Sequence, residues 1–317
     1  MRQTGILPDQ DISALFQSGA LKSPRGLDAD QVQPASLDLR LGDKAWRVRA
    51  SFLPGPNHRV AEKLDRLKLH EIDLADGAVL ETGCVYIVPL LESLALPANV
   101  SASANPKSST GRLDIFTGNA LLSESELHEL HRAETLVATE PPNISGGGIA
   151  LSIDLDGDKD GLVGYRGKHH TGLVDVDKRA AQDVVDFWEP LYKSGAGELV
   201  LDPDEFYILV SQEAVHVPPL YAAEMTPFDP LVGEFRVHYA GFFDPGFGHS
   251  AAGGTGSRAV LEVRSHEVPF ILDHGQIVGR LVYEHMLKRP QALYGTDLGS
   301  NYQAQGLKLS KHFRAAR

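Results

Sequence analysis

The sequence predicts a mainly β protein that contains two related copies of one unit. Many short apolar segments lie between Gly, Pro and Asp residues, a spacing typical of a barrel or sandwich rather than of a parallel α/β sheet. Residues 80–106 and 201–227 also match at a single offset of 121 residues (201 minus 80). Seven positions are identical at this offset, which favours tandem copies of a β-rich unit: Leu80/Leu201, Tyr86/Tyr207, Ile87/Ile208, Glu92/Glu213, Pro97/Pro218, Ala102/Ala223 and Pro106/Pro227.

The repeat defines the domain organisation that we expect. A first unit would occupy 1–122, a helix with linker and bridging strands 123–180, and a second unit 181–317; a length of 317 residues also favours about two domains. The first copy is the shorter one, because the chain passes from Thr117 to a predicted helix at Ser123 without returning strands. Either this copy is truncated or a stretch is missing from it.

Composition and charge exclude several classes of protein. The net charge of −12 argues against a general nucleic-acid binder, which needs a basic surface, but it allows a small anionic ligand held by local cations. No run of about 18 apolar residues occurs, so we expect no membrane span. The N-terminal residues lack the apolar core of a signal peptide, and Cys84 is the only cysteine. We therefore expect a reducing, cytoplasmic location without disulfides.

Periodicity predicts the individual elements in order. Residues 11–21 are expected to form a helix with Asp11 as its N-cap. A capping box at 123–126 predicts a second helix to about Glu134. Alternating or continuous apolar segments predict strands at 36–41, 45–48, 79–80, 84–90, 149–155, 161–176, 235–240 and 258–264.

Glu262 is the first candidate for chemistry. Along the predicted strand 258–264, Leu261 faces one side and Val260 faces the other together with Glu262, so a carboxylate lies within an apolar strand. The strand follows a tight turn at Asp244-Pro245-Gly246 and a glycine-rich loop. A buried carboxylate is costly unless it is paired or used in chemistry. The alternative is a Glu that pairs with a neighbouring arginine on a solvated face.

The loop Asn105-Pro106-Lys107-Ser108-Ser109-Thr110-Gly111-Arg112 is the second candidate. Its hydroxyls, its backbone N–H groups and its two cations are the parts of a phosphate cradle. The alternative is a polar loop that caps the next element. At the offset of 121, Ser108 corresponds to Asp229 and Arg112 to Gly233, so the second copy lacks these groups. We therefore expect one composite site per chain, with the cradle from the first copy and the carboxylate from the second.

The patterns that suggest a metal are weak. The acidic turn at 156–161 matches the start of a calcium loop, but its twelfth position is Gly167 rather than the required Glu, which favours a solvated turn. His128 and His131 are three residues apart, whereas a zinc-protease helix has a spacing of four. The paired cysteines of the zinc deaminases do not occur in the sequence, so we expect no zinc.

In their order along the chain, these motifs resemble the dCTP deaminase branch of the dUTPase-like superfamily, in a long form with two repeats. That family has a phosphate loop with paired serines, an Asp-Pro-Gly hairpin, a strand with a catalytic Glu, a glycine-containing strand and a C-terminal lid. The matching segments are 107–112, 244–246, 260–262, 275–281 and 294–305, and 34–40 resembles the family's N-terminal strand. The resemblance covers most of the chain and implies tandem distorted β-barrels, jelly-roll-like, with a few short helices.

The resemblance also implies the roles of the site residues. Glu262 would be the general base, and Ser108, Arg112 and the backbone of Ala240 would hold the attacking water. Asp244 would bind the 3′-hydroxyl of the deoxyribose. The nucleotide-binding residues that the resemblance implies are Lys107, Ser108, Ser109, Arg112, Asp244, Tyr294, Asn301, Gln305 and Lys308.

Two positions depart from the family pattern. Asn301 stands where the family has a lid lysine, so Lys308 or Lys311 would have to replace it. Phe242 stands just before the hairpin, where the family often has an arginine. Both departures remove a positive charge and weaken the triphosphate binding that we expect.

The activity that the resemblance implies is the hydrolytic deamination of dCTP to dUTP and ammonia, with Mg²⁺ bound through the triphosphate. The alternatives are a dUTP diphosphatase or a bifunctional dCTP deaminase/dUTPase and, in other classes, a non-catalytic nucleotide sensor or a β-rich interaction protein. The expected partners are dCTP and dUTP, with dTTP as a candidate inhibitor. A homo-oligomer is also expected from the resemblance.

Overall fold

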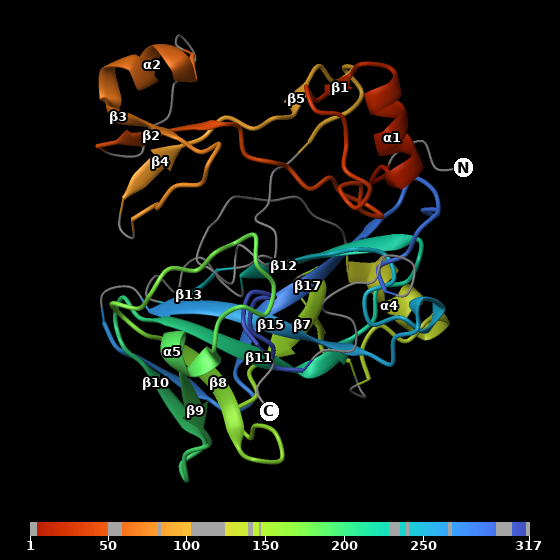
Figure 1. Cartoon of the computed structure of the whole chain (residues 1–317). Coiled ribbons are helices and arrows are strands. Elements are labelled where there is room, and N and C mark those ends of the chain that lie inside the picture. The colour runs from red at the N-terminus through yellow and green to blue at the C-terminus, as the bar shows by residue number, and fades with distance from the viewer. Residues whose placement is uncertain are drawn as a thin grey trace. The chain divides into compact units, whose positions relative to one another are not determined.

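The chain forms two compact units (Figure 1). The computed structural model describes residues 5–49, 59–81, 84–102, 124–138, 142–145, 147–227, 235–238, 241–265, 268–295 and 306–314. The large unit comprises Met1–Ile12, Gln33–Ser36 and Ser101–Arg317, and the small unit comprises Ser13–Val32 and Leu37–Val100. Strands dominate both units, which confirms the predicted mainly β class.

Two five-stranded sheets make up most of the large unit. The first sheet, in the order β13-β15-β11-β8-β9, contains Phe235–His238, Ser257–Ser265, Phe206–Val215, Leu162–Gly167 and Trp188–Tyr192. The second sheet, in the order β14-β12-β17-β7-β6, contains Phe242–Phe243, Tyr221–Pro227, Ile277–His285, Gly148–Ser152 and Ile144–Ser145. β10 (Glu198–Leu201) pairs separately with β16 (Phe270–Asp273). The neighbouring strands are antiparallel, as in β-sandwiches and barrels.

Short helices complete the large unit. Within the described residues after Ser101 they are α4 (Glu124–Ala133), α5 (Val184–Phe187) and the single turn η1 (Ser250–Ala252). The segment 123–180, which we expected to act as a bridge, contributes β6, β7 and β8 to the same two sheets as the later strands. Among the residues that the structure describes, no helix is both long enough and apolar enough to span a membrane.

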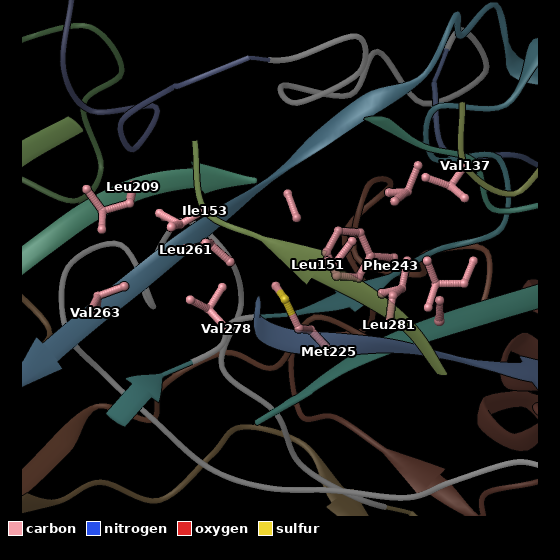
Figure 2. Packing of buried hydrophobic residues seen from close by; sticks show 14 of the residues in the cluster. Val137, Leu151, Ile153, Leu209, Met225, Phe243, Leu261, Val263, Val278 and Leu281 are labelled. Atoms are coloured by element: carbon pink, nitrogen blue, oxygen red, sulfur yellow. The ribbon is translucent and has the colours of Figure 1, made fainter. Parts of the chain in front are cut away.

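The main core of the large unit lies between its two sheets. Leu261 on β15 belongs to the same buried cluster as Leu151 on β7, Met225 on β12 and Leu281 on β17 (Figure 2). The alternation predicted for 258–264 is therefore confirmed: Leu261 points into this core. Val260, one residue earlier, belongs to a different cluster on the opposite face of the first sheet.

That second cluster covers the outer face of the first sheet. The sheet contributes buried apolar side chains from β11 and β15, among them Ile208 and Val260. Trp188, at the start of the edge strand β9, belongs to the same cluster, and Phe187 at the end of α5 and Phe313 from the C-terminal segment pack with it. The first sheet is thus buried on both faces in this region, which explains why Phe206–Val210, the first half of β11, is a continuous apolar run.

The small unit contains a three-stranded sheet and a two-stranded pair. The sheet has the order β3-β2-β4, formed by Lys68–Asp73, Lys44–Val48 and Val85–Ile87, and β1 (Leu21–Lys22) pairs with β5 (Ser93–Leu94). α2 (Val60–Leu67) precedes β3, and α1 (Asp9–Gln17) begins in the large unit and continues into the small one.

One buried carboxylate organises the polar interior of the small unit. Glu92 accepts hydrogen bonds from the backbone N–H and Nε of Arg40, both at 2.9 Å, and from Nε2 of Gln31 at 2.9 Å. Burial raises the pKa of Glu92, but these hydrogen bonds outweigh it and hold the pKa below its usual value.

The two copies share a local hydrogen bond at the predicted offset. The hydroxyl of Tyr86 accepts the backbone N–H of Glu81 at 3.0 Å, and the hydroxyl of Tyr207 accepts that of Asp202 at 2.9 Å. Each tyrosine also lies opposite an arginine of the neighbouring strand, Arg47 for Tyr86 and Arg166 for Tyr207. The repeat is therefore a repeat of geometry as well as of sequence.

Equivalent apolar residues differ in burial between the copies. Leu80 and Leu94 of the small unit are 44% and 55% exposed. Their counterparts at the offset of 121, Leu201 and Val215, are 0% exposed in the large unit. The small unit thus carries apolar side chains of the repeat without the cover that they have in the large unit.

Several predicted elements differ from the structure. Residues 36–41 form only isolated bridges, Val32 to Leu37 and Leu41 to Leu90, because no neighbouring strand continues their pairing. The first helix begins at Asp9 rather than Asp11, since the Pro8 carbonyl already accepts the N–H of Asp11. The strand β8 is shorter than expected and ends at Gly167 instead of 176, and no strand forms at 79–80. The helix α2 and the strand β3 were not predicted. Cys84 is half-buried and precedes β4 rather than belonging to it.

The hydrogen bond to a tyrosine hydroxyl occurs in both copies, but replacing the tyrosine by phenylalanine should change the free energy of unfolding by different amounts in the two. Tyr207→Phe should lower the free energy of unfolding by about 1–2 kcal/mol, because Tyr207 is buried and the Asp202 N–H would lose its partner. Tyr86→Phe should cost less than about 0.5 kcal/mol, because water can replace the hydroxyl there. Denaturant unfolding of the two variants checks this, and equal losses would contradict it.

Candidate functional site

Glu262 lies near the middle of β15 and is buried, with 2% of its surface exposed. Its backbone pairs with Ile208 on β11 and with His238 on β13, so the strand is enclosed on both edges. Directly opposite residues share a face of a sheet, so Glu262 lies beside Ile208 and Val260 on the outer face of the first sheet. The alternative of a solvated carboxylate is therefore wrong.

Two arginines share this face of β15. Arg258 donates from Nη2 to Oδ2 of Asp154 at 2.6 Å, and that carboxylate is almost fully buried. Arg264 donates from Nη1 to the carbonyl of Asp204 at 2.8 Å, and its guanidinium lies 5.4 Å from the ring centre of Phe206. Arginines therefore lie on both sides of Glu262 along the strand, and the charge of Arg258 is balanced by Asp154.

The turn at Asp244-Pro245-Gly246 has the predicted tight geometry. The N–H of Phe247 donates to the carbonyl of Asp244 at 3.1 Å and closes the turn. Gly246 has a φ of +102°, and a Cβ at this position would lie 2.9 Å from the carbonyl oxygen of Tyr294. Only glycine fits, both for its backbone conformation and for the close approach of a second segment.

Three distant segments meet at this turn. The Asp244 Oδ1 accepts the backbone N–H of Ala35 at 3.2 Å, and the carbonyl of Pro245 accepts the N–H of Tyr294 at 2.8 Å. The ring of Tyr294 lies 5.8 Å from that of Phe247. The structure thus brings together the N-terminal motif, the hairpin and the start of the C-terminal segment. Sequence reasoning had not connected Ala35 with Asp244.

The chain itself limits the distance between the turn and Glu262. His238 lies opposite Glu262 on β13, at the edge of the first sheet, and Asp244 follows six residues later at the end of β14 in the second sheet. Six residues span at most about 22 Å. The backbone of Asp244 therefore lies within about 22 Å of His238, the residue that pairs with Glu262.

The structure describes only part of the predicted site. Lys308 is exposed and lies between Leu307 and Leu309, which both pack into the cluster on the outer face of the first sheet. Phe242 on β14 packs beside Ala35, Ala222 and Met286. The predicted site residues that lie outside the described residues are Lys107, Ser108, Ser109, Arg112, Ala240, Asn301 and Gln305.

A pair of buried or half-buried carboxylates was not predicted from the sequence. Glu224 on β12 lies opposite Phe242 on β14 and is largely buried, and Glu284 on β17 is half-buried near it. Burial and the charge of Glu224 together raise the pKa of Glu284. The signal was available, because Glu224 lies within an apolar strand just as Glu262 does.

The acidic turn is occupied by its own hydrogen bonds. Oδ1 of Asp158 accepts the N–H groups of Asp160 and Leu162 at 2.9 and 3.0 Å. Asp156 pairs with Lys193 at 2.6 Å, and this hydrogen bond lowers its pKa. Within the described part of the chain, no group of three or more His, Cys, Asp or Glu side chains could hold a metal ion.

Fold and site together define a class: a mainly β protein with a repeated unit, in which a buried glutamate on a sheet follows an Asp-Pro-Gly turn. The chain belongs to the 2′-deoxycytidine 5′-triphosphate deaminase (DCD) family. The family's C-terminal domain matches residues 123–313, and its N-terminal domain matches residues 3–133. The resemblance inferred from the motifs is confirmed.

Several proteins similar to this chain are named as dCTP deaminases. The crystal structure of 2′-deoxycytidine 5′-triphosphate deaminase from Agrobacterium tumefaciens is 65% identical, with a TM-score of 0.87 over 94% of this chain and 100% of that chain. dCTP deaminase from Alteromonas mediterranea is 35% identical over 118 residues, and "dCTP deaminase, dUMP-forming" from Corynebacterium kroppenstedtii is 36% identical over 113. Each of these two matches covers 35% of this chain and 59% of the curated relative.

The close packing at the turn gives a test by substitution. Gly246→Ala should destabilise the large unit by about 1–3 kcal/mol, because alanine at a φ of +102° is strained and its methyl group would meet Tyr294. Thermal or denaturant unfolding measures the loss. Gly195→Ala is the matched control, since nothing lies within 4 Å of a Cβ there. An unfolding free energy that is equal for Gly246→Ala and the control would contradict the geometry.

Proposed function

We propose that this protein hydrolyses the 4-amino group of dCTP and releases dUTP and ammonia. The single observation that carries the proposal is the buried carboxylate of Glu262 on an enclosed strand, in a chain that matches the deaminase family along most of its length. A carboxylate within reach of a water can take a proton from it as the oxygen attacks C4 of cytosine. The same group then returns a proton to the departing amine.

The remaining roles in the proposal come from the family pattern. Ser108, Arg112 and the Ala240 backbone would hold the attacking water, and Lys107 and Ser109 would bind phosphate with them. Asp244 would bind the deoxyribose 3′-hydroxyl, and its hydrogen bond from Ala35 is compatible with this role because a carboxylate accepts several donors. The proposed contacts from the C-terminal segment are Tyr294, Asn301, Gln305 and Lys308.

The proposal includes the surroundings of the reaction. Mg²⁺ would accompany the substrate by binding its triphosphate, and the chemistry at C4 would use no zinc. The proposed partners are dCTP, dUTP and, as an inhibitor, dTTP. We further propose a cytoplasmic location, which the single cysteine supports. We also propose a homo-oligomer, which the family pattern supports.

Glu262→Gln tests the proposed mechanism directly. The amide cannot accept a proton from water, so ammonia release from dCTP should fall by about 10²–10⁴, the usual effect of losing a general base. Binding of dCTP, followed by calorimetry, should persist because the substitution preserves shape. Glu198→Gln, on the exposed edge of β10, is the control and should retain wild-type turnover. A Glu262→Gln variant with unimpaired turnover would remove Glu262 from the mechanism.

A bifunctional enzyme is the second candidate, because one relative is named as dUMP-forming. The two candidates differ in their products: deamination alone gives dUTP and ammonia, whereas the bifunctional reaction gives dUMP, pyrophosphate and ammonia. Incubation of the wild-type protein with each dNTP and Mg²⁺, with ammonia and pyrophosphate measured in parallel, separates them. Tight nucleotide binding without either product would favour a sensor.

A further inference from the structure

Residues 310–314 are held along the segment that precedes α5. The N–H groups of Ala180 and Ala181 donate to the carbonyls of Lys311 and His312, both at 3.0 Å. The N–H of Arg314 donates in turn to the carbonyl of Gln182 at 2.9 Å. Residues 310–314 therefore run beside 180–183 through backbone hydrogen bonds, although about 130 residues separate them in sequence.

A buried polar pair locks this arrangement. Ser310 and His312 are each 2% exposed, and Oγ of Ser310 lies 2.7 Å from Nδ1 of His312. Nε2 of His312 lies 3.0 Å from the carbonyl of Val176, which can only accept, so Nε2 carries the proton. Burial lowers the pKa of His312 and so favours the neutral imidazole, in which Nδ1 accepts from the serine hydroxyl. His312 then has a partner on each nitrogen.

An aromatic contact joins the C-terminal segment to the sheet. Phe313 meets Phe187 edge to face, with ring centres 5.5 Å apart, and Trp188 likewise at 5.9 Å. These rings belong to the same cluster as Ile208 and Val260, which lie beside Glu262 on the outer face of the first sheet.

We propose that Ser310, His312 and Phe313 are positioning residues that clamp segment 306–314 over the sheet face that bears Glu262. In this arrangement the chain covers its own catalytic strand, and the clamp maintains the water-poor face in which nucleotide is bound. The inference rests on the proposed function for the role of that face, whereas the clamp itself rests on the contacts alone. None of the three residues needs to touch the substrate.

The clamp has a defined dependence on pH. Burial lowers the pKa of His312, as do the charges of Lys311 and Arg179, while the Val176 carbonyl and Asp175 oppose the shift. In the unfolded or released segment the histidine has its ordinary pKa of about 6.5, so release is accompanied by proton uptake below that pH. The clamp is therefore fully stable above about pH 6.5 and weakens as the pH falls toward the lowered pKa.

Limited proteolysis of the full chain, combined with kinetics, tests the clamp. Trypsin cleavage after Lys308 and Lys311, followed by mass spectrometry, reports release of the segment. Ser310→Ala should accelerate this cleavage about tenfold, the factor expected for losing one buried hydrogen bond. It should raise KM for dCTP by a similar factor while kcat changes less than about twofold. Phe313→Ala should act in the same direction and more strongly.

Controls distinguish the clamp from general destabilisation and from the proposed activity. Lys159→Ala removes one side chain of an exposed ion pair with Asp160, and it should leave cleavage and KM unchanged. In the wild type, cleavage measured relative to trypsin's own rate on an unstructured peptide at the same pH should be faster at pH 5.5 than at pH 7.5, because trypsin itself slows when its catalytic histidine is protonated; Ser310→Ala should show a smaller difference. Unchanged cleavage in both variants, or faster cleavage with unchanged KM, would overturn the proposal. Failure of the proposed function would appear separately, as wild-type protein that releases no ammonia.

Discussion

The large unit depends on keeping one carboxylate, that of Glu262, out of bulk water. A charged group within a sheet is costly unless its surroundings compensate for lost hydration. Here β11 and β13 close both edges of the strand, the core packs beneath it, and arginines lie before and after Glu262 on its own face. The cluster that includes Phe187 and Phe313 then limits access of solvent from outside. Each of these features would be unnecessary for an ordinary surface glutamate.

Local rules explain what the sequence could predict. The alternation around Leu261 follows from the two-residue period of a strand, and the turn at Asp244 follows from the backbone preferences of proline and glycine. The offset of 121 residues was also visible in sequence, because tyrosines that make the same short-range hydrogen bond recur at Tyr86 and Tyr207. The role of the loop at 107–112 stays a prediction, since it lies outside the described residues.

Long-range contacts explain what the sequence could not predict. The bond between Ala35 and Asp244 joins residues 209 positions apart, and no spacing rule anticipates it. The pairing of Gln182 with Phe313 is of the same kind. Residues 36–41 were predicted to form a strand but make only isolated bridges. Alternation indicates that a segment could be a strand, but a strand forms only where a neighbouring segment offers backbone groups for pairing.

The contrast between Leu80 and Leu201, or between Leu94 and Val215, has a practical consequence. The small unit leaves exposed the apolar side chains whose counterparts in the large unit are completely buried. It would therefore be a poor choice for expression as a separate fragment. Such surface promotes self-association in water. Expressing the halves of this protein separately would therefore measure the self-association of this exposed apolar surface as well as the activities of the two repeats.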